Sequence, residues 1–79
     1  MSLTAAQLRA ARALINITQD DLAGRAGVAT KTIATFESEG RAPREATLVK
    51  LQGALEQAGV VFVETDIGVG VILGRAPTN

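Results

Sequence analysis

The sequence predicts a mainly α-helical fold in which four short helices are followed by a C-terminal β-hairpin. Two observations lead to this prediction. Up to about Gly59, apolar residues recur at spacings of three and four, as they do in helices that bury one face. From Val60 onward the pattern changes to short β-branched runs, which are typical of strands. A chain of 79 residues has the length of one small domain, and we divide it into a helical part (1–59) and a hairpin (60–75).

The first helix is expected to begin just after Thr4 and to run to about Ile15. Thr4 and Gln7 have the spacing of a capping box, in which a hydroxyl and an amide side chain satisfy free backbone donors at a helix start. Leu8, Ala11 and Ile15 recur three and four residues apart, so these side chains should share one face and pack in the core.

The second helix is expected over about residues 19–26. Thr18 can cap its first turn, and Asp20 and Asp21 place negative charge at its positive end. Two adjacent carboxylates could instead suggest a metal or acid–base pair, but neighbouring side chains on a helix diverge. We therefore interpret them as a complement to the helix dipole. Gly27 can adopt the left-handed conformation that ends this helix before the next begins.

The third helix is expected to begin near Ala29 or Thr30, where the cap is ambiguous, and to end by Ser38. Gly40 should terminate it, and Pro43 suits a position just before or at the start of the fourth helix. The fourth helix should end before Gly59, and its apolar stripe consists of Leu48, Leu51, Leu55 and Ala58.

The two apolar runs near the C-terminus predict a β-hairpin with a loop of about three residues at Asp66-Ile67-Gly68. Its first strand is apolar on both faces, with Phe62 on one side and its valine neighbours on the other. Because two strands alone are not stable in water, one face can cover the helices while the other face or an open edge needs another chain. We therefore predict that hairpins from two subunits form a dimer, with an interface made of Val61, Val63, Val69, Val71 and Ile72.

The composition excludes most catalytic chemistry. The chain has no Cys and no His, which excludes Cys/His metal sites, thiol chemistry and acid–base catalysis by imidazole. The glycine-rich stretch from Gly68 to Gly74 lacks the following helix that a phosphate-binding loop requires. We therefore expect that the protein is not an enzyme and binds neither a metal ion nor a cofactor.

The charges are balanced overall but unevenly distributed. Residues 1–44 hold six basic and four acidic side chains, so a small basic surplus lies in the helical part. No signal peptide is recognisable, and no apolar run approaches the roughly 20 residues that a membrane span requires. A cytoplasmic protein without membrane association is expected.

The stretch from Gln19 to Glu37 combines these features in two short helices joined by a glycine turn, which is a helix-turn-helix. Small Ala23 and Gly27 lie where the two helices must approach closely. The same period would also suit an ordinary helical hairpin, so the interpretation depends on residue type as well as spacing. The apolar positions of the motif are Leu22, Ala26, Val28, Ile33 and Phe36.

Over residues 5–59 the chain resembles the Cro/CI-type (XRE family) helix-turn-helix regulators. The resemblance is carried by Gln19, Leu22-Ala23, Gly27-Val28, Ile33 and Glu37. It implies a four-helix, lambda-repressor-like DNA-binding domain with its helix-turn-helix at residues 19–37. The hairpin is not part of the common domain, although Cro also dimerises through a C-terminal strand.

In this family the third helix enters the major groove, and its first exposed residues touch base edges. The resemblance implies base reading by Thr30, Lys31 and Thr35, and phosphate or minor-groove contacts from Gln19, Thr32, Arg41 and Arg44. It also implies a structural ion pair between Arg12 and Glu37. The chain departs from the family at Ala29, because the family commonly has a polar N-cap residue at this position. Alanine weakens the start of the third helix unless Thr30 acts as the cap instead. Ala34 is a further departure, because it offers only apolar contact.

Three functions follow from these observations. The first is a dimeric regulator, a repressor by preference, that binds double-stranded DNA at a palindromic operator through the major groove. The second is an antitoxin that regulates its own operon while the hairpin binds a toxin protein. The third is a protein-interaction adaptor that does not bind DNA, which the near-neutral charge would suit.

Overall fold

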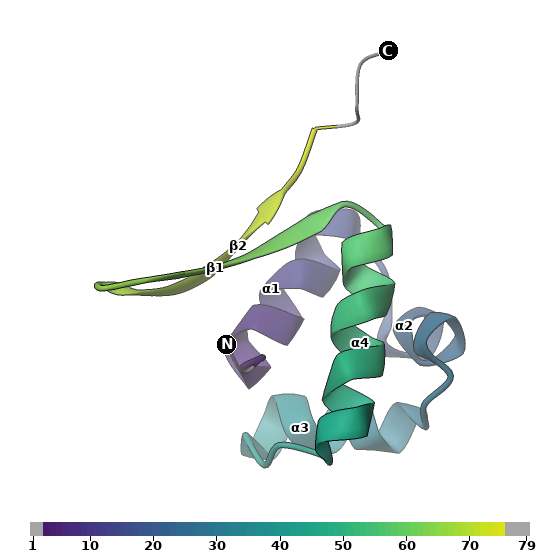
Figure 1. Cartoon of the computed structure of the whole chain (residues 1–79). Coiled ribbons are helices and arrows are strands. Elements are labelled where there is room, and N and C mark those ends of the chain that lie inside the picture. Colours follow the sequence, from purple (N-terminus) through teal and green to yellow (C-terminus); the bar gives the residue numbers. More distant parts are fainter. Residues whose placement is uncertain (1–2, 76–79) are drawn as a thin grey trace.

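The computed structural model describes residues 3–75, so residues 1 and 2 of the expected helical part lie outside it. Figure 1 shows the four helices and the two-stranded antiparallel hairpin that the sequence predicts. No helix within the described residues is long and apolar enough to cross a membrane. In chain order the elements are α1 (Ala5–Ile15), α2 (Gln19–Ala26), α3 (Thr30–Glu39), α4 (Glu45–Gln57), β1 (Val60–Thr65) and β2 (Gly68–Leu73).

Side-chain caps fix the starts of α1 and α2. The Thr4 hydroxyl accepts from the Gln7 backbone N–H at 3.0 Å, and the Gln7 side chain accepts from the Thr4 N–H at 3.1 Å. Thr18 and Asp21 form the same reciprocal pair at the start of α2. Gly27 then takes a left-handed conformation with φ of 70°, which ends α2 and turns the chain into α3.

The core lies where the helices meet the base of the hairpin. Val60, the first residue of β1, is buried against it, and full burial of a side chain of this kind contributes about 1.5–3 kcal/mol. The hairpin is therefore an extension of the helical core. The buried apolar residues of the described part are Leu3, Leu8, Ala11, Leu22, Ala23, Ile33, Phe36, Leu48, Leu51, Leu55 and Val60.

The turn of the hairpin is shorter than the sequence analysis predicts. Thr65 pairs with Gly68, so Gly68 belongs to β2 and only Asp66 and Ile67 form the turn. The Thr65 hydroxyl accepts from the Ile67 backbone N–H and donates to the Gly68 carbonyl, both at 3.3 Å. These two bonds lie within the turn, whose two-residue length is common in hairpins.

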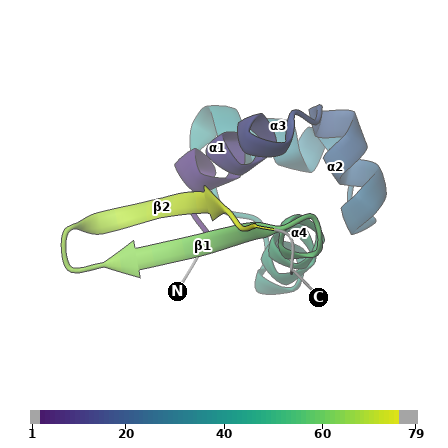
Figure 2. The ribbon, with the colours of Figure 1, turned by 90° about the horizontal axis from the view of Figure 1, so that it is seen from above.

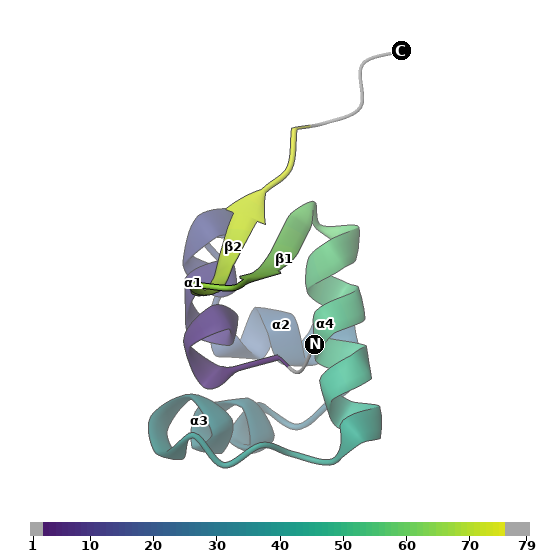
Figure 3. The same ribbon diagram turned by 60° about the vertical axis from the view of Figure 1, so that its left-hand side comes forward.

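The hairpin lies across α1 and beside the C-terminal end of α4, and its tip projects beyond the helices (Figure 2). Figure 3 shows α3 at the opposite side of the molecule from the hairpin. The buried side chain of Gln7 ties α1 to the middle of the hairpin, because its Nε2 donates to the Gly70 carbonyl at 3.0 Å and to the Val63 carbonyl at 3.4 Å. Gln7 thus serves both the start of α1 and the placement of the strands.

The strand register divides the five residues predicted for the dimer interface between two faces. Val71 pairs with Phe62, and both side chains pack against the core, so Val71 does not belong to an outward surface. Val69 lies on the same face as Val71, nearer the tip. The outward face carries Val61 and its partner Ile72, which are 49% and 53% exposed, together with half-buried Val63. Val69 is nevertheless 49% exposed, so the five residues lie on two faces of the hairpin and their role in a dimer interface stays a prediction.

Candidate nucleic-acid interface

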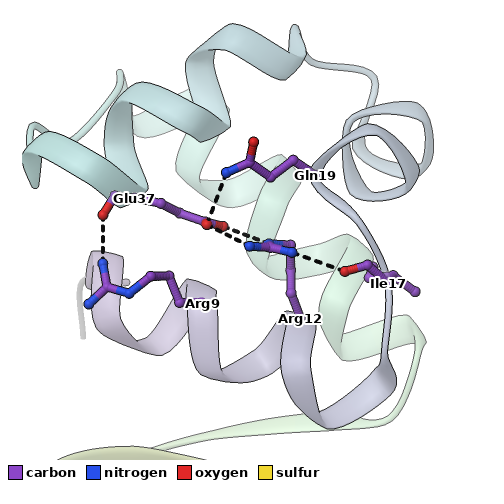
Figure 4. Close-up of polar contacts among 5 residues, drawn as sticks. All are labelled: Arg9, Arg12, Ile17, Gln19 and Glu37. Carbon is purple, nitrogen blue, oxygen red and sulfur yellow. Dashed lines mark hydrogen bonds and ion pairs between the residues drawn. The ribbon is translucent and has the colours of Figure 1, made fainter.

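An ion pair holds α3 against the rest of the helical domain. Arg12 of α1 donates to Glu37 of α3 through Nε and Nη2, each at 2.7 Å from a different carboxylate oxygen (Figure 4). The Arg12 Nη1 also donates to the Ile17 carbonyl at 3.0 Å, which fixes the guanidinium plane. Only 5% of the Glu37 side chain is exposed, so this two-point contact is largely shielded from water.

Two further donors converge on Glu37. The Gln19 amide of α2 donates to its carboxylate at 3.1 Å, and Arg9 of α1 donates to its backbone carbonyl at 2.6 Å (Figure 4). Arg9 therefore stabilises the C-terminal end of α3 as a cation near unpaired carbonyls, a role that the sequence analysis did not assign. Through Glu37, α1 and α2 together set the orientation of α3.

The surroundings of Arg12 and Glu37 favour the ionised form of both side chains. Burial alone would raise the pKa of Glu37, but hydrogen bonds from Arg12 and Gln19 and the charges of Arg12 and Arg9 hold that pKa below its ordinary value. The hydrogen bond to Glu37 raises the pKa of Arg12 despite its partial burial. Both partners are thus ionised at neutral pH.

The N-terminal part of α3 and the loop after it line an open hollow of about 390 Å³. This hollow brings together two of the expected base readers, Lys31 and Thr35, with two residues expected to contact the DNA backbone, Thr32 and Arg41. Lys31 and Arg41 are exposed, so their cationic groups are accessible to an anion. The remaining lining residues are Ala29, Ala42 and Pro43.

Arg44 and Arg41 occupy the loop between α3 and α4 in different ways. Arg44 is the exposed N-cap of α4. Arg41 lies 3.4 Å from Glu39 in an ion pair whose side chains are both largely exposed. Such a surface pair contributes little free energy, so Glu39 does not prevent Arg41 from contacting a phosphate.

A second hollow, of about 490 Å³, lies at the junction of α2 and α3. Thr30 lines this hollow, and its hydroxyl donates to the Asp20 carboxylate at 2.7 Å. Ala29 is the N-cap of α3, and its methyl group cannot accept a hydrogen bond. Thr30 does not take over as cap, because it is already the first helical residue and no side chain forms a cap hydrogen bond at this helix start. The Asp20 charge lies beside the start of α3 instead. The other lining residues are Arg12, Thr18 and Gln19.

Sequence reasoning missed the contribution of Asp20. Its spacing from Thr30 carries no periodic signal, since the two residues are ten positions apart and belong to different helices. Within residues 3–75, no three side chains of His, Cys, Asp and Glu come together in a way that could hold a metal ion.

The four-helix arrangement, the glycine turn between α2 and α3, and the accessible start of α3 define a helix-turn-helix DNA-binding protein. A family model described as helix-turn-helix (HTH_3) matches residues 8–57, and the chain belongs to this family of Cro/CI-type, XRE-family DNA-binding transcriptional regulators. The family is one of regulatory domains and not of enzymes. No curated protein matches the chain.

Proposed function

We propose that this regulator is a dimeric repressor that recognises a palindromic operator by placing α3 in the major groove. The observation that carries the proposal is the hollow at the start of α3, where Lys31 and Thr35 lie beside Thr32 and Arg41. Lys31 can donate to guanine O6 or N7, and Thr35 can exchange a hydrogen bond or offer its methyl group to thymine. Thr32, Gln19, Arg41 and Arg44 would contact phosphates or the minor groove, which positions the protein without reading sequence.

The small reading surface supports a dimer. Lys31 is the one cation among the proposed base readers, so a single subunit would bind weakly. Two subunits with half-sites about 34 Å apart would bind far more tightly, because the second contact becomes intramolecular. The exposed apolar face at Val61 and Ile72 suits a second copy of the chain, and the hairpin that carries it lies on the opposite side of the molecule from α3 (Figure 3). Such a dimer would repress transcription where its operator overlaps a promoter.

The apolar face also supports a second candidate function. In an antitoxin, the same Val61 and Ile72 surface would bind a toxin protein instead of another copy of the chain. Co-purification of a stoichiometric, non-identical protein with the full chain would favour the antitoxin, whereas a self-sufficient homodimer favours the repressor. An adaptor without DNA binding would bind no duplex at low salt.

Binding-site selection from random duplex DNA, followed by titration at several salt concentrations, tests the proposed function. We expect a palindromic motif and an affinity that falls steeply with salt. Lys31→Ala should reduce affinity and relax the preference at one position in each half-site. The matched control is Lys50→Ala, which removes an exposed cation from α4. If Lys31→Ala and Lys50→Ala behave alike, α3 is not the reading helix.

A further inference from the structure

The contact between Asp20 and Thr30 limits the hydrogen bonds that the start of α3 can offer. The Thr30 hydroxyl donates to the Asp20 Oδ1 at 2.7 Å, and both side chains line the hollow between α2 and α3. A hydroxyl has a single hydrogen, and a carboxylate accepts but does not donate. While this bond is kept, the two side chains present only acceptor lone pairs to a third group.

The fold holds this pair in place before any ligand arrives. Asp20 lies in the first turn of α2, whose start is fixed by the capping box of Thr18 and Asp21. Thr30 is the first residue of α3, immediately after the turn. A hydrogen bond from a hydroxyl to a carboxylate is typically short, and the bond between Thr30 and Asp20 has this length at a solvent-exposed position.

We propose that Asp20 and Thr30 form an acceptor-only recognition element that selects a base with an exocyclic amino group, either adenine N6 or cytosine N4, in the major groove. Guanine presents O6 and N7 there, and thymine presents O4. These acceptors would face acceptors and lose their hydration without a partner, which disfavours them. The inference rests on the proposed operator recognition by α3, and it gives Asp20 the role of a positioning residue that sets the polarity of Thr30.

The neighbouring residue has the opposite polarity. The Lys31 ammonium only donates, and it lines the other hollow. One half-site should therefore combine a base that offers an amino group with a base that offers acceptors, and guanine suits the second position best.

The test uses binding-site selection with the full chain and three variants, followed by competition between defined duplexes. Thr30→Val removes the hydroxyl while keeping the shape, and it should change the preference at one position of each half-site. At that position, replacing adenine by purine or cytosine by 2-pyrimidinone removes the amino group. The wild-type protein should then bind about three- to tenfold more weakly, the effect of one hydrogen bond. Whichever replacement has this effect identifies the base.

Two further variants separate the roles of the pair. Thr30→Ser keeps the hydroxyl and should retain the wild-type preference. Asp20→Ala frees the Thr30 hydroxyl to donate. This variant should therefore bind a base that offers an amino group and a base that offers a carbonyl equally well. The control for loss of a negative charge is Glu56→Gln, near the end of α4 that lies away from α3, and it should leave the preference unchanged.

The possible failures are distinguishable. If wild type selects a motif but tolerates loss of the amino group, the inference is wrong and the proposed function stands. The same holds if Thr30→Val and Asp20→Ala keep the wild-type preference at every position. If the folded wild-type protein binds no duplex, the proposed function and this inference fall together.

Discussion

Arg12 and Glu37, which are 25 residues apart in the chain, face each other across the junction of α1 and α3 with both of their hydrogen bonds at 2.7 Å. Gln19 adds a third donor to the same carboxylate. The orientation of α3 therefore depends on a charged contact as well as on the apolar core beneath it. Stability and DNA binding should both respond when this contact is altered.

Glu37→Ala should lower the free energy of unfolding by about 2–3 kcal/mol, because Arg12 would remain partly buried without its partner. Urea unfolding followed by circular dichroism would measure the loss. Arg41→Ala is the control, since it breaks an exposed pair and should cost less than about 0.5 kcal/mol. Equal effects of the two variants would show that the buried pair contributes no more than a surface contact.

The same carboxylate should make stability depend on acid pH. The pKa of Glu37 is lower in the folded state than its ordinary value of 4.5, so folding favours its ionised form. Its contribution is complete above pH 4.5 and is lost as the pH falls from there through the folded-state pKa. Asp21, whose pKa is lowered by hydrogen bonds from Thr18, acts in the same direction.

Urea unfolding between about pH 3 and pH 7 would measure this dependence, because this range includes the ordinary pKa of a carboxyl group. Glu37→Gln should flatten part of the acid limb of the curve. A wild-type stability that stays constant down to the acid end of this range would contradict the assignment.

Gln7→Leu should loosen the hairpin from α1. It removes the side-chain donor to the carbonyls of Val63 and Gly70, which pair with each other in the strand ladder, and a hydrogen bond of this kind contributes about 0.5–1.5 kcal/mol. Hydrogen exchange should accelerate in β1 and β2 more than in α3. Thr4→Ala is the matched control, because it disrupts the same capping box but leaves the bonds to the strands. Identical exchange patterns in the two variants would mean that Gln7 acts only as part of the cap.

Ile72→Lys should dissociate the proposed dimer without unfolding the subunit, because its side chain lies on the outward face of the hairpin. Sedimentation velocity would measure the change in mass. Val71→Lys should instead destabilise the subunit, since Val71 packs against the core. A wild-type chain that remains a monomer at micromolar concentration would rule out the dimer.

The helices could be predicted from the sequence because their signals are local. Apolar residues at spacings of three and four, the Thr4 and Thr18 caps and the left-handed Gly27 each act within a few residues, and the structure keeps all of them. The family resemblance then implied a helix-turn-helix regulator, and the match over residues 8–57 confirmed the family.

The hairpin register and the Asp20 contact could not be predicted in the same way. The structure places Gly68 in β2, so the turn is one residue shorter than expected, and a shift of one residue exchanges the two faces of a strand. A negative charge at the start of α2 already accounts for Asp20, so the sequence gives no reason to expect its hydrogen bond with Thr30. Gln7 was likewise explained by the capping box, which hid its bonds to the strands.

One helix, α1, is hydrogen-bonded both to the hairpin and to α3. Gln7 on this helix is bonded to the hairpin, and Arg9 and Arg12, less than two turns further along, are bonded to the end of α3. In a dimer joined through its hairpins, α1 of each subunit would therefore fix the distance between the two α3 helices. Inserting one base pair at the centre of an operator moves the half-sites apart by about 3.4 Å and rotates them around the duplex. A short helix cannot stretch to follow, so such a protein should be strict about the length of its operator as well as about its sequence.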